Sequence, residues 1–298
     1  MDGVINVYKE PGWTSGDVVN KLKGLLHQRH IGHGGTLDPD AEGVLPVCVG
    51  KATRLFDFLT SRHKTYQARV RFGVITDTQD ASGQILSQCA PGFSYQELLD
   101  AAAKLTGRIQ QVPPMYSALH QGGKRLYELA RQGKIVERQP REIEIESLTV
   151  LTPIEEDECS IRVVCGRGTY IRTLCEDLGN LLGCGAHMRH LLRESAGGLC
   201  VEDSLKIRQI ADQIQKHDFS FVLPMDRAVT FLPAVIFSSA AQKKLKNGNP
   251  AEADLVLRKD TVKENEPVRI YCEELFIGIG CLKQGFYHIQ CRLGGETP

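Results

Sequence analysis

A glycine-rich loop with one acid is the part of this chain best suited to chemistry. It reads Gly32-His33-Gly34-Gly35-Thr36-Leu37-Asp38-Pro39. Pro39 biases Asp38 away from helical backbone angles, and the glycines let a bound group approach the backbone closely. The loop therefore predicts a catalytic carboxylate held beside open space. An Asp that only closes a turn uses the same residue types, so both interpretations stay open here.

Two residues far from the loop have types that would complete such a site. Arg172 stands at the start of an expected helix, after the break at Gly166-Arg167-Gly168. If it faces Asp38, its charge would keep the carboxylate ionised and oriented. Tyr66 opens an expected strand and could stack on a planar base, although core packing is the commoner use. Taken singly, Arg172 fits an ordinary surface ion pair at least as well.

Other motifs with recognisable chemistry fail on their spacing. Gly50-Lys51-Ala52-Thr53 lacks the first glycine of a phosphate-binding loop and the Ser or Thr directly after the lysine. His187 and His190 lack an acid at metal-site spacing, so we predict no metal. The chain has no Gly-x-Ser-x-Gly elbow and no dinucleotide fingerprint. His33 could orient a ligand or only satisfy loop carbonyls.

Length and composition indicate a globular chain with room for one large and one small domain. It has 298 residues, of which 42% are hydrophobic and 24% charged. No apolar run approaches the roughly 20 residues that span a bilayer, and no secretory signal is visible at the start. The ten cysteines form no Cys-x-x-Cys pair, which is typical of reduced thiols. We therefore expect a cytoplasmic protein without a membrane partner.

Positive charge gathers in one segment although the net charge is zero. Between His120 and Arg141, six basic side chains stand against two acidic ones, the basic ones being Lys124, Arg125, Arg131, Lys134, Arg138 and Arg141. Such a segment is compatible with phosphate contacts. A solvated surface gives the same pattern.

Periodicity and capping predict the elements that position these residues. A helix should begin at Thr14 or Ser15, with Val18 and Leu22 on its apolar face. A strand is expected over residues 66–72, and the capping box that Ser94 opens starts a helix that ends near Gly107. Strands follow at 142–150 and 160–165. The next helices are expected from Ile171, with Leu181 on its apolar stripe, and over about 204–215.

Two regions depart from this regular pattern. Residues 108–140 contain Pro113-Pro114 and several glycines, which predicts a mobile excursion outside the core. From about Phe231 the elements become short, with a small helix near 239–245. A hairpin signal at Lys283-Gln284-Gly285 joins the last two strands. About 65 residues of short strands predict a small β-barrel.

Taken together, the order of these motifs resembles the TruB-type tRNA pseudouridine-55 synthases. The matching stretches are 9–15, 32–46, 50–54, 64–66, 76–78 with Asp80, 112–124, 126–127, 167–172, 177–179 and 183–187. The resemblance covers residues 3 to about 230, and the tail with Asn247-Gly248-Asn249-Pro250 resembles the RNA-binding PUA domain. It implies an α+β fold, with a mixed, mainly antiparallel central sheet flanked by helices in a catalytic domain of residues 1–230. A PUA-like β-barrel would occupy residues 231–298.

The resemblance also implies a function, the isomerisation of uridine 55 in the T-loop of tRNA to pseudouridine without cofactor or metal. The target base must first leave its stack. By analogy Asp38 is the catalytic carboxylate, and six residues form the rest of the site. Arg172 would pair with Asp38, Tyr66 would stack on the base, Tyr170 would line the pocket, Leu191 would close its apolar wall, His33 would lie near the extruded nucleotide, and Asp80 would bond the base or its neighbour.

The basic segment acquires a role in the same way, as a thumb insertion over about 108–141. Its side chains at Lys124, Arg125, Arg131 and Lys134 would contact the RNA backbone, and the tail domain would contact the acceptor stem. We expect a monomer. One departure from the family stands beside Asp38, where Asp40 and Glu42 replace apolar and small polar residues and could raise its pKa.

Two other functions remain open from the sequence. A tRNA-binding or tRNA-folding protein with a vestigial site would bind tRNA without forming product. A metal-dependent hydrolase using His187 and His190 would lose activity on chelation.

Overall fold

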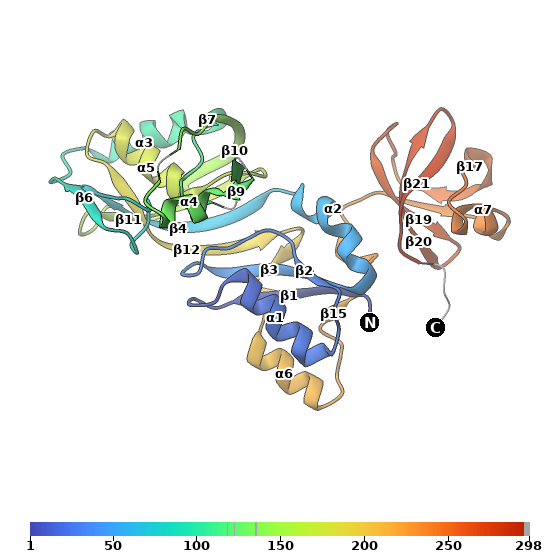
Figure 1. Cartoon of the computed structure of the whole chain (residues 1–298). Coiled ribbons are helices and arrows are strands. Elements are labelled where there is room, and N and C mark those ends of the chain that lie inside the picture. Colours follow the sequence, from blue (N-terminus) through green and yellow to red (C-terminus); the bar gives the residue numbers. More distant parts are fainter. Residues whose placement is uncertain (118, 122, 135, 295–298) are drawn as a thin grey trace.

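The computed structural model describes residues 1–117, 119–121, 123–134 and 136–294. Within these residues the larger part of the chain is built on an eleven-stranded sheet (Figure 1). Its main path runs β14–β1–β3–β12–β4–β11–β10–β7, with β2, β13 and β15 paired at its sides. In chain order the strands are β1 (Gly3–Lys9), β2 (Ile31–His33), β3 (Glu42–Val49), β4 (Lys64–Phe72), β7 (Gly107–Gln111), β10 (Arg141–Val150), β11 (Glu158–Cys165), β12 (Ala186–Ala196), β13 (Leu199–Cys200), β14 (Leu205–Lys206) and β15 (Val222–Leu223).

The pairing of these strands confirms a mixed, mainly antiparallel sheet. β1–β14 and β3–β12 pair in parallel, and the other described pairs of this sheet are antiparallel. The parallel pair β3–β12 brings two segments that are distant in the sequence side by side within the sheet.

Helices cover both halves of the sheet (Figure 1). α1 (Ser15–Leu26) and α6 (Ile207–Gln215) lie on the half that contains β1 and β3, where Leu22 and Ile210 are fully buried with Val47 in one apolar cluster. α3 (Tyr95–Lys104) and α5 (Ile171–Leu181) cover the other half. Arg172 is therefore carried by the first turn of a well-packed helix.

Local signals predicted the starts of two helices correctly. Thr14 caps α1, and its side chain and that of Asp17 form a reciprocal capping box. Ser94 and Glu97 form the same box at α3. Each box satisfies backbone N–H groups that the first helical turn leaves without partners.

Two predicted boundaries differ because of long-range pairing, and one residue predicted to be apolar core is exposed. α6 starts at Ile207 because Leu205 and Lys206 pair with β1 as β14. The excursion expected from residue 108 starts after Gln111, because β7 pairs with β10 inside the main sheet. Leu181 is half exposed, so it does not belong to the apolar stripe of α5.

Smaller elements complete the larger part of the chain. β5 (Val74–Thr76) and β6 (Ile85–Gln88) form a hairpin, and α2 (Phe56–Thr60) follows β3 after a short turn of helix. Beyond Gln111, the described part of the excursion contains β8 (His120–Gln121), β9 (Lys124–Arg125) and α4 (Leu126–Arg131). No helix among the described residues is long and apolar enough to cross a membrane.

The C-terminal residues form a second, separate sheet (Figure 1). Among the described residues it has six strands in the order β17–β21–β20–β19–β16–β18 and its own apolar core. The strands are β16 (Ala234–Phe237), β17 (Ala251–Glu252), β18 (Val256–Lys259), β19 (Pro267–Cys272), β20 (Leu275–Lys283) and β21 (Phe286–Arg292), with α7 (Gln242–Lys246) beside them. The predicted final hairpin is β20–β21. Arg54 Nη1 joins this part to the larger one by donating to the carbonyl of Arg292 at 3.0 Å.

Candidate active site

Asp38 lies in the loop between β2 and β3, and its two neighbours in the chain are held by hydrogen bonds. The hydroxyl of Ser15 accepts from the N–H of Leu37 at 2.9 Å and lies 3.2 Å from the carbonyl of Leu37. Lys9, which is fully buried, donates from Nζ to the carbonyls of Pro39 at 2.8 Å and Trp13 at 2.6 Å. The backbone on both sides of Asp38 is therefore fixed, and with it the direction of the side chain.

Two nitrogens of Arg172 bind the two carboxylate oxygens of Asp38. Nε lies 2.9 Å from Oδ2, and Nη2 donates to Oδ1 at 3.1 Å. The Arg172 side chain is 6% exposed, whereas that of Asp38 is 35% exposed. Two-point pairing fixes the plane of the carboxylate as well as its position. One edge of an oriented carboxylate thus remains open to a reacting group.

Two further N–H groups of Arg172 donate to backbone carbonyls. Nη1 donates to the carbonyl of Thr78 at 3.2 Å, and Nη2 to that of Tyr116 at 2.8 Å. A guanidinium with its donors satisfied tolerates burial far better than an unpaired one. Arg172 is consequently a rigid partner for Asp38 rather than a mobile side chain.

Asp80 lies on the other side of the guanidinium. Its Oδ2 is 3.7 Å from Arg172 Nη1. Its Oδ1 accepts from the hydroxyls of Thr78 at 2.7 Å and Ser82 at 2.6 Å. Asp80 therefore lies beside the Asp38–Arg172 pair, and its bond to the base or its neighbour stays a prediction.

Burial and charge act on Asp38 in opposite directions. Desolvation raises the pKa of Asp38, the pairing with Arg172 lowers it, and the negative charge of Asp80 raises it again. The loss of water around the carboxyl outweighs the attraction, so the pKa of Asp38 lies above that of an ordinary Asp. A carboxylate in this state is more basic and less hydrated than one in water.

Aromatic and apolar side chains surround the pair. Tyr66 on β4 and Leu191 on β12 are buried in one cluster with Leu37. Tyr170 precedes α5, where its N–H donates to Oε1 of Gln111 at 2.8 Å. Burial raises the pKa of both Tyr66 and Tyr170, and the charge of Asp38 acts on both in the same direction.

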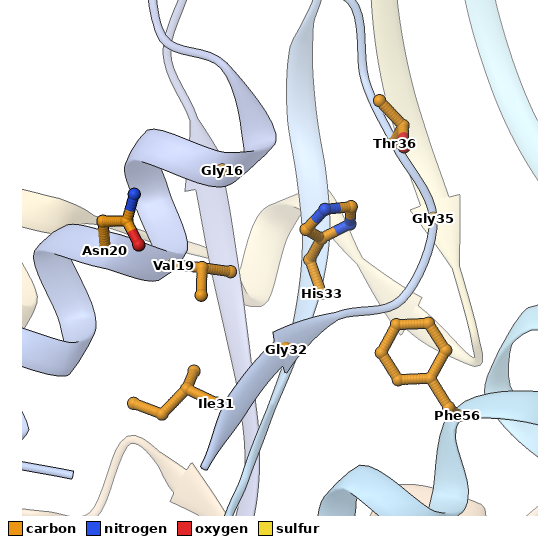
Figure 2. A pocket seen from close by; sticks show the side chains of 9 residues that line it. All are labelled: Gly16, Val19, Asn20, Ile31, Gly32, His33, Gly35, Thr36 and Phe56. Carbon is orange, nitrogen blue, oxygen red and sulfur yellow. The ribbon is translucent and has the colours of Figure 1, made fainter. Parts of the chain in front are cut away.

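His33 borders a pocket beside the same loop (Figure 2). The pocket has a volume of about 490 Å³, within the range of small-ligand sites. Figure 2 shows the ring of His33 between the α1 residue Asn20 and the loop residue Thr36, with Phe56 of α2 on a further side. Burial lowers the pKa of His33 below its usual value. A neutral imidazole therefore stands next to open space.

The two extra acids of the loop are less involved with Asp38 than Asp80 is. Glu42 accepts from the hydroxyl of Tyr8 at 2.7 Å and lies 2.9 Å from Nε2 of His190. Asp40 is exposed. Among acidic side chains, it is Asp80 whose charge raises the pKa of Asp38.

The two histidines considered for metal binding have unrelated partners. Nδ1 of buried His187 lies 2.9 Å from the carbonyl of Val74, whereas His190 is about half exposed beside Glu42. No group of three or more His, Cys, Asp or Glu side chains that could hold a metal occurs in the part of the chain that the structure describes.

The basic segment is described in part. The side chains of Lys124, Arg125 and Arg131 lie outside what the structure describes, although β9 and α4 contain their backbones. Lys134 is exposed. At the base of the excursion, Arg138 donates from Nη1 to the carbonyl of Pro113 at 3.0 Å, which ties its outgoing and returning segments together.

Sequence reasoning missed two buried cations that hold the loop. Lys9 belongs to a matching motif but has no role assigned from it, and Arg193 belongs to none of the motifs. Arg193 is 1% exposed and donates from Nε to the carbonyl of Val44 at 2.6 Å. The only indication in the sequence is that each interrupts an apolar strand pattern.

Comparison with known proteins agrees with this geometry. Residues 23–171 match the family model described as TruB family pseudouridylate synthase (N terminal domain), and residues 172–230 match the tRNA pseudouridylate synthase B C-terminal domain. The protein named tRNA pseudouridine synthase B in Lachnoclostridium phytofermentans is 43% identical over 290 residues, which cover 94% of each chain. That of Clostridium kluyveri is 40% identical over 284 residues, 95% of this chain and 96% of the relative.

Chains in solved structures have a fold similar to that of this chain. A chain from the structure of an H/ACA RNP bound to a substrate RNA containing 2′-deoxyuridine superposes with a TM-score of 0.76 at 24% identity, covering 99% of this chain and 85% of that one. A chain of a Cbf5-Nop10-Gar1 complex gives 0.73 at 26% identity, covering 99% and 84%. With two family models spanning residues 23–230 and full-length relatives near 40% identity, the chain belongs to the TruB family of pseudouridylate synthases.

Proposed function

We propose that this protein isomerises a uridine of tRNA to pseudouridine and that Asp38 is the catalytic carboxylate. The two-point pair between Asp38 and buried Arg172 carries this proposal, because it presents one open edge of a desolvated acid. Relatives that are named tRNA pseudouridine synthase B support tRNA as the substrate. The resemblance to the family makes uridine 55 of the T-loop the expected target.

The reaction needs only an internal transfer of the base. The C1′–N1 bond breaks, the base turns, and a C1′–C5 bond forms. C5 then gives up its proton while N1 gains one, so atoms and electrons balance without an added reductant or oxidant. Asp38 would act on the sugar or the base at the first step, and Tyr66 would stack on the turned ring and serve in the proton transfer.

The base must leave the RNA stack to reach this site. The Asp38 carboxylate is only partly exposed among buried side chains, so a stacked base could not approach it. Extrusion costs a few kcal/mol, and stacking on an aromatic ring returns about 1–3 kcal/mol. Tyr66 would supply that ring, with Tyr170 and Leu191 lining the pocket and His33 near the extruded nucleotide.

Asp80 keeps in this proposal the role that the resemblance implies, a bond to the base or its neighbour. Its Oδ1 accepts from the hydroxyls of Thr78 and Ser82, whereas its Oδ2 lies 3.7 Å from Nη1 of Arg172. From this place Asp80 would also orient Arg172, which in turn orients Asp38.

The pH dependence follows from the surroundings of Asp38. Since its pKa is raised, acidification should protonate it at a higher pH than an ordinary Asp, and kcat/KM should fall there. Asp80→Asn removes a charge that raises this pKa, so the fall should move to lower pH. Glu42→Gln with Asp40→Asn should leave the midpoint of the pH–rate profile unchanged. A midpoint that moves with the loop acids and not with Asp80 would contradict this assignment.

Phosphate contacts by the thumb should make tRNA binding depend steeply on salt despite the neutral net charge. Each neutralised phosphate contributes about 0.7–0.9 to the slope of log K against log salt. Lys134→Ala should reduce that slope by about one, with little change in the single-turnover rate at saturating enzyme. Gln132→Ala, a neutral neighbour in the same segment, is the matched control. Equal slopes for the parent and Lys134→Ala would remove Lys134 from the RNA interface.

Two further assignments belong to the same proposal. We assign residues 1–230 to catalysis and residues 231–298 to binding of the acceptor stem. The protein would act as a monomer in the cytoplasm.

One assay separates this function from its alternatives. Purified protein is incubated with unmodified tRNA, with and without EDTA, and pseudouridine is mapped by position. We expect modification at uridine 55 in both samples. Binding without product would favour an RNA-binding protein with a vestigial site, and activity lost on chelation would favour a metal enzyme using His187 and His190.

A further inference from the structure

Arg193 occupies the centre of the larger sheet, between the two strands that carry the candidate site. It lies on β12, where it is in register with Gly43 of β3 on one side and Tyr66 of β4 on the other. Gly43 has a φ of +104°, and a Cβ there would lie 2.3 Å from the carbonyl oxygen of Arg193. The close approach of β3 and β12 at this point therefore requires glycine.

The side chain of Arg193 binds backbone on both sides of Asp38 in the loop that carries it. Nη2 and Nη1 donate to the carbonyls of Gly35 at 3.2 Å and Thr36 at 3.3 Å, before Asp38 in the chain. Nε donates to the carbonyl of Val44 at 2.6 Å, after it. One buried guanidinium thus ties the outgoing and returning segments of the loop to each other.

Tyr66 lies directly across from Arg193 in the register of β4 and β12, and the charge of Arg193 opposes the rise in the pKa of Tyr66. Arginine carries only donors, so where the phenol meets this guanidinium its oxygen must accept. The hydroxyl hydrogen of Tyr66 then points away from Arg193 and is free for another acceptor. A tyrosine without this partner could rotate its hydroxyl between positions.

We propose that Arg193 is a positioning residue for the isomerisation, which holds the Asp38 loop and turns the Tyr66 hydroxyl toward the base. The inference rests on the proposed function and adds a residue that touches neither RNA nor reacting atoms. It explains why a fully buried cation binds carbonyls on both sides of Asp38 and lies in register with Tyr66. Shortening the side chain should disturb the rate of chemistry rather than RNA binding.

Arg193→Lys tests this inference because it keeps the charge but cannot hold all three carbonyls in the geometry of the guanidinium. We expect the single-turnover rate to fall roughly 10- to 100-fold, since small misplacements of reacting groups have effects of that size. The affinity for tRNA and the thermal midpoint should change little by comparison. Arg189→Lys, an exposed arginine on the same strand, should keep the parent rate.

A double-mutant cycle with Tyr66→Phe distinguishes positioning from general damage to the fold. If Arg193 acts partly through the Tyr66 hydroxyl, the two rate losses should combine to less than their product. Losses that multiply fully, or an Arg193→Lys variant with the parent rate, would overturn the inference. If Arg193→Lys does not fold, Tyr66→Phe still tests the inference, because a parent rate without the hydroxyl would overturn the part that concerns Tyr66.

The parent protein in the same assay keeps the two proposals distinct. Absence of pseudouridine in the parent would overturn the proposed function. A parent that forms pseudouridine beside an equally fast Arg193→Lys variant would overturn only the role of Arg193.

Discussion

Asp38→Asn should reduce pseudouridine formation at least about 10³-fold while tRNA still binds. Asparagine has nearly the same shape and can still accept from Arg172, so the loop and the surrounding cluster should persist. It cannot carry the negative charge that the structure desolvates and aims at one open edge. A 10³-fold loss corresponds to about 4 kcal/mol of transition-state stabilisation.

Tritium release from tRNA labelled at C5 of uridine measures this loss directly, because C5 gives up its hydrogen in the reaction. Single-turnover conditions separate chemistry from product release. Asp40→Asn is the matched control, an exposed acid two residues away in the same loop. The assignment of Asp38 would be wrong if Asp38→Asn released tritium at near the parent rate.

Arg172→Lys should reduce the single-turnover rate roughly 10²–10³-fold, although the charge is retained. An ammonium cannot hold both oxygens of Asp38 and also satisfy the carbonyls of Thr78 and Tyr116. Asp38 would then be free to rotate and would face Asp80 with weaker compensation. We therefore also expect the acidic limb of the pH–rate profile to move to higher pH.

Arg162→Lys provides the comparison for an exposed arginine pair. Arg162 donates to Glu194 at 2.9 Å on the surface of the same sheet, where either cation serves about equally well. The single-turnover rate of the Arg162→Lys variant should match that of the parent protein. Equal rates for Arg172→Lys and the parent would show that two-point holding of Asp38 contributes nothing to the reaction.

The sequence best predicted those structural features that depend on residues close together in the chain. Capping boxes predicted the starts of α1 and α3, because the partners are three residues apart. Asp38 and Arg172 are 134 residues apart. Their pairing could be expected only because the order of motifs resembles a family.

The main residues that sequence reasoning missed are buried cations, and the reason is physical. Lys and Arg are almost never fully buried, so pattern analysis places them on the surface. Lys9 and Arg193 are buried because loop carbonyls satisfy their donors. Those acceptors come together only when β1, β3 and β12 are paired.

The positions of β7 and β14 could not be predicted for a related reason. Each strand depends on a partner remote in the sequence, β10 and β1 respectively. The secondary-structure propensity of a short segment does not depend on such partners, so it cannot predict them.

A structure of the Asp38→Asn protein with an unmodified T-arm hairpin would show whether an extruded uridine meets the side chain of residue 38. We expect uridine 55 outside the RNA stack, its ring against Tyr66, and its C1′ or C6 about 3–3.5 Å from that side chain. A uridine that stays stacked in the loop, or that is extruded but seated away from residue 38 and Arg172, would contradict the role given to Asp38.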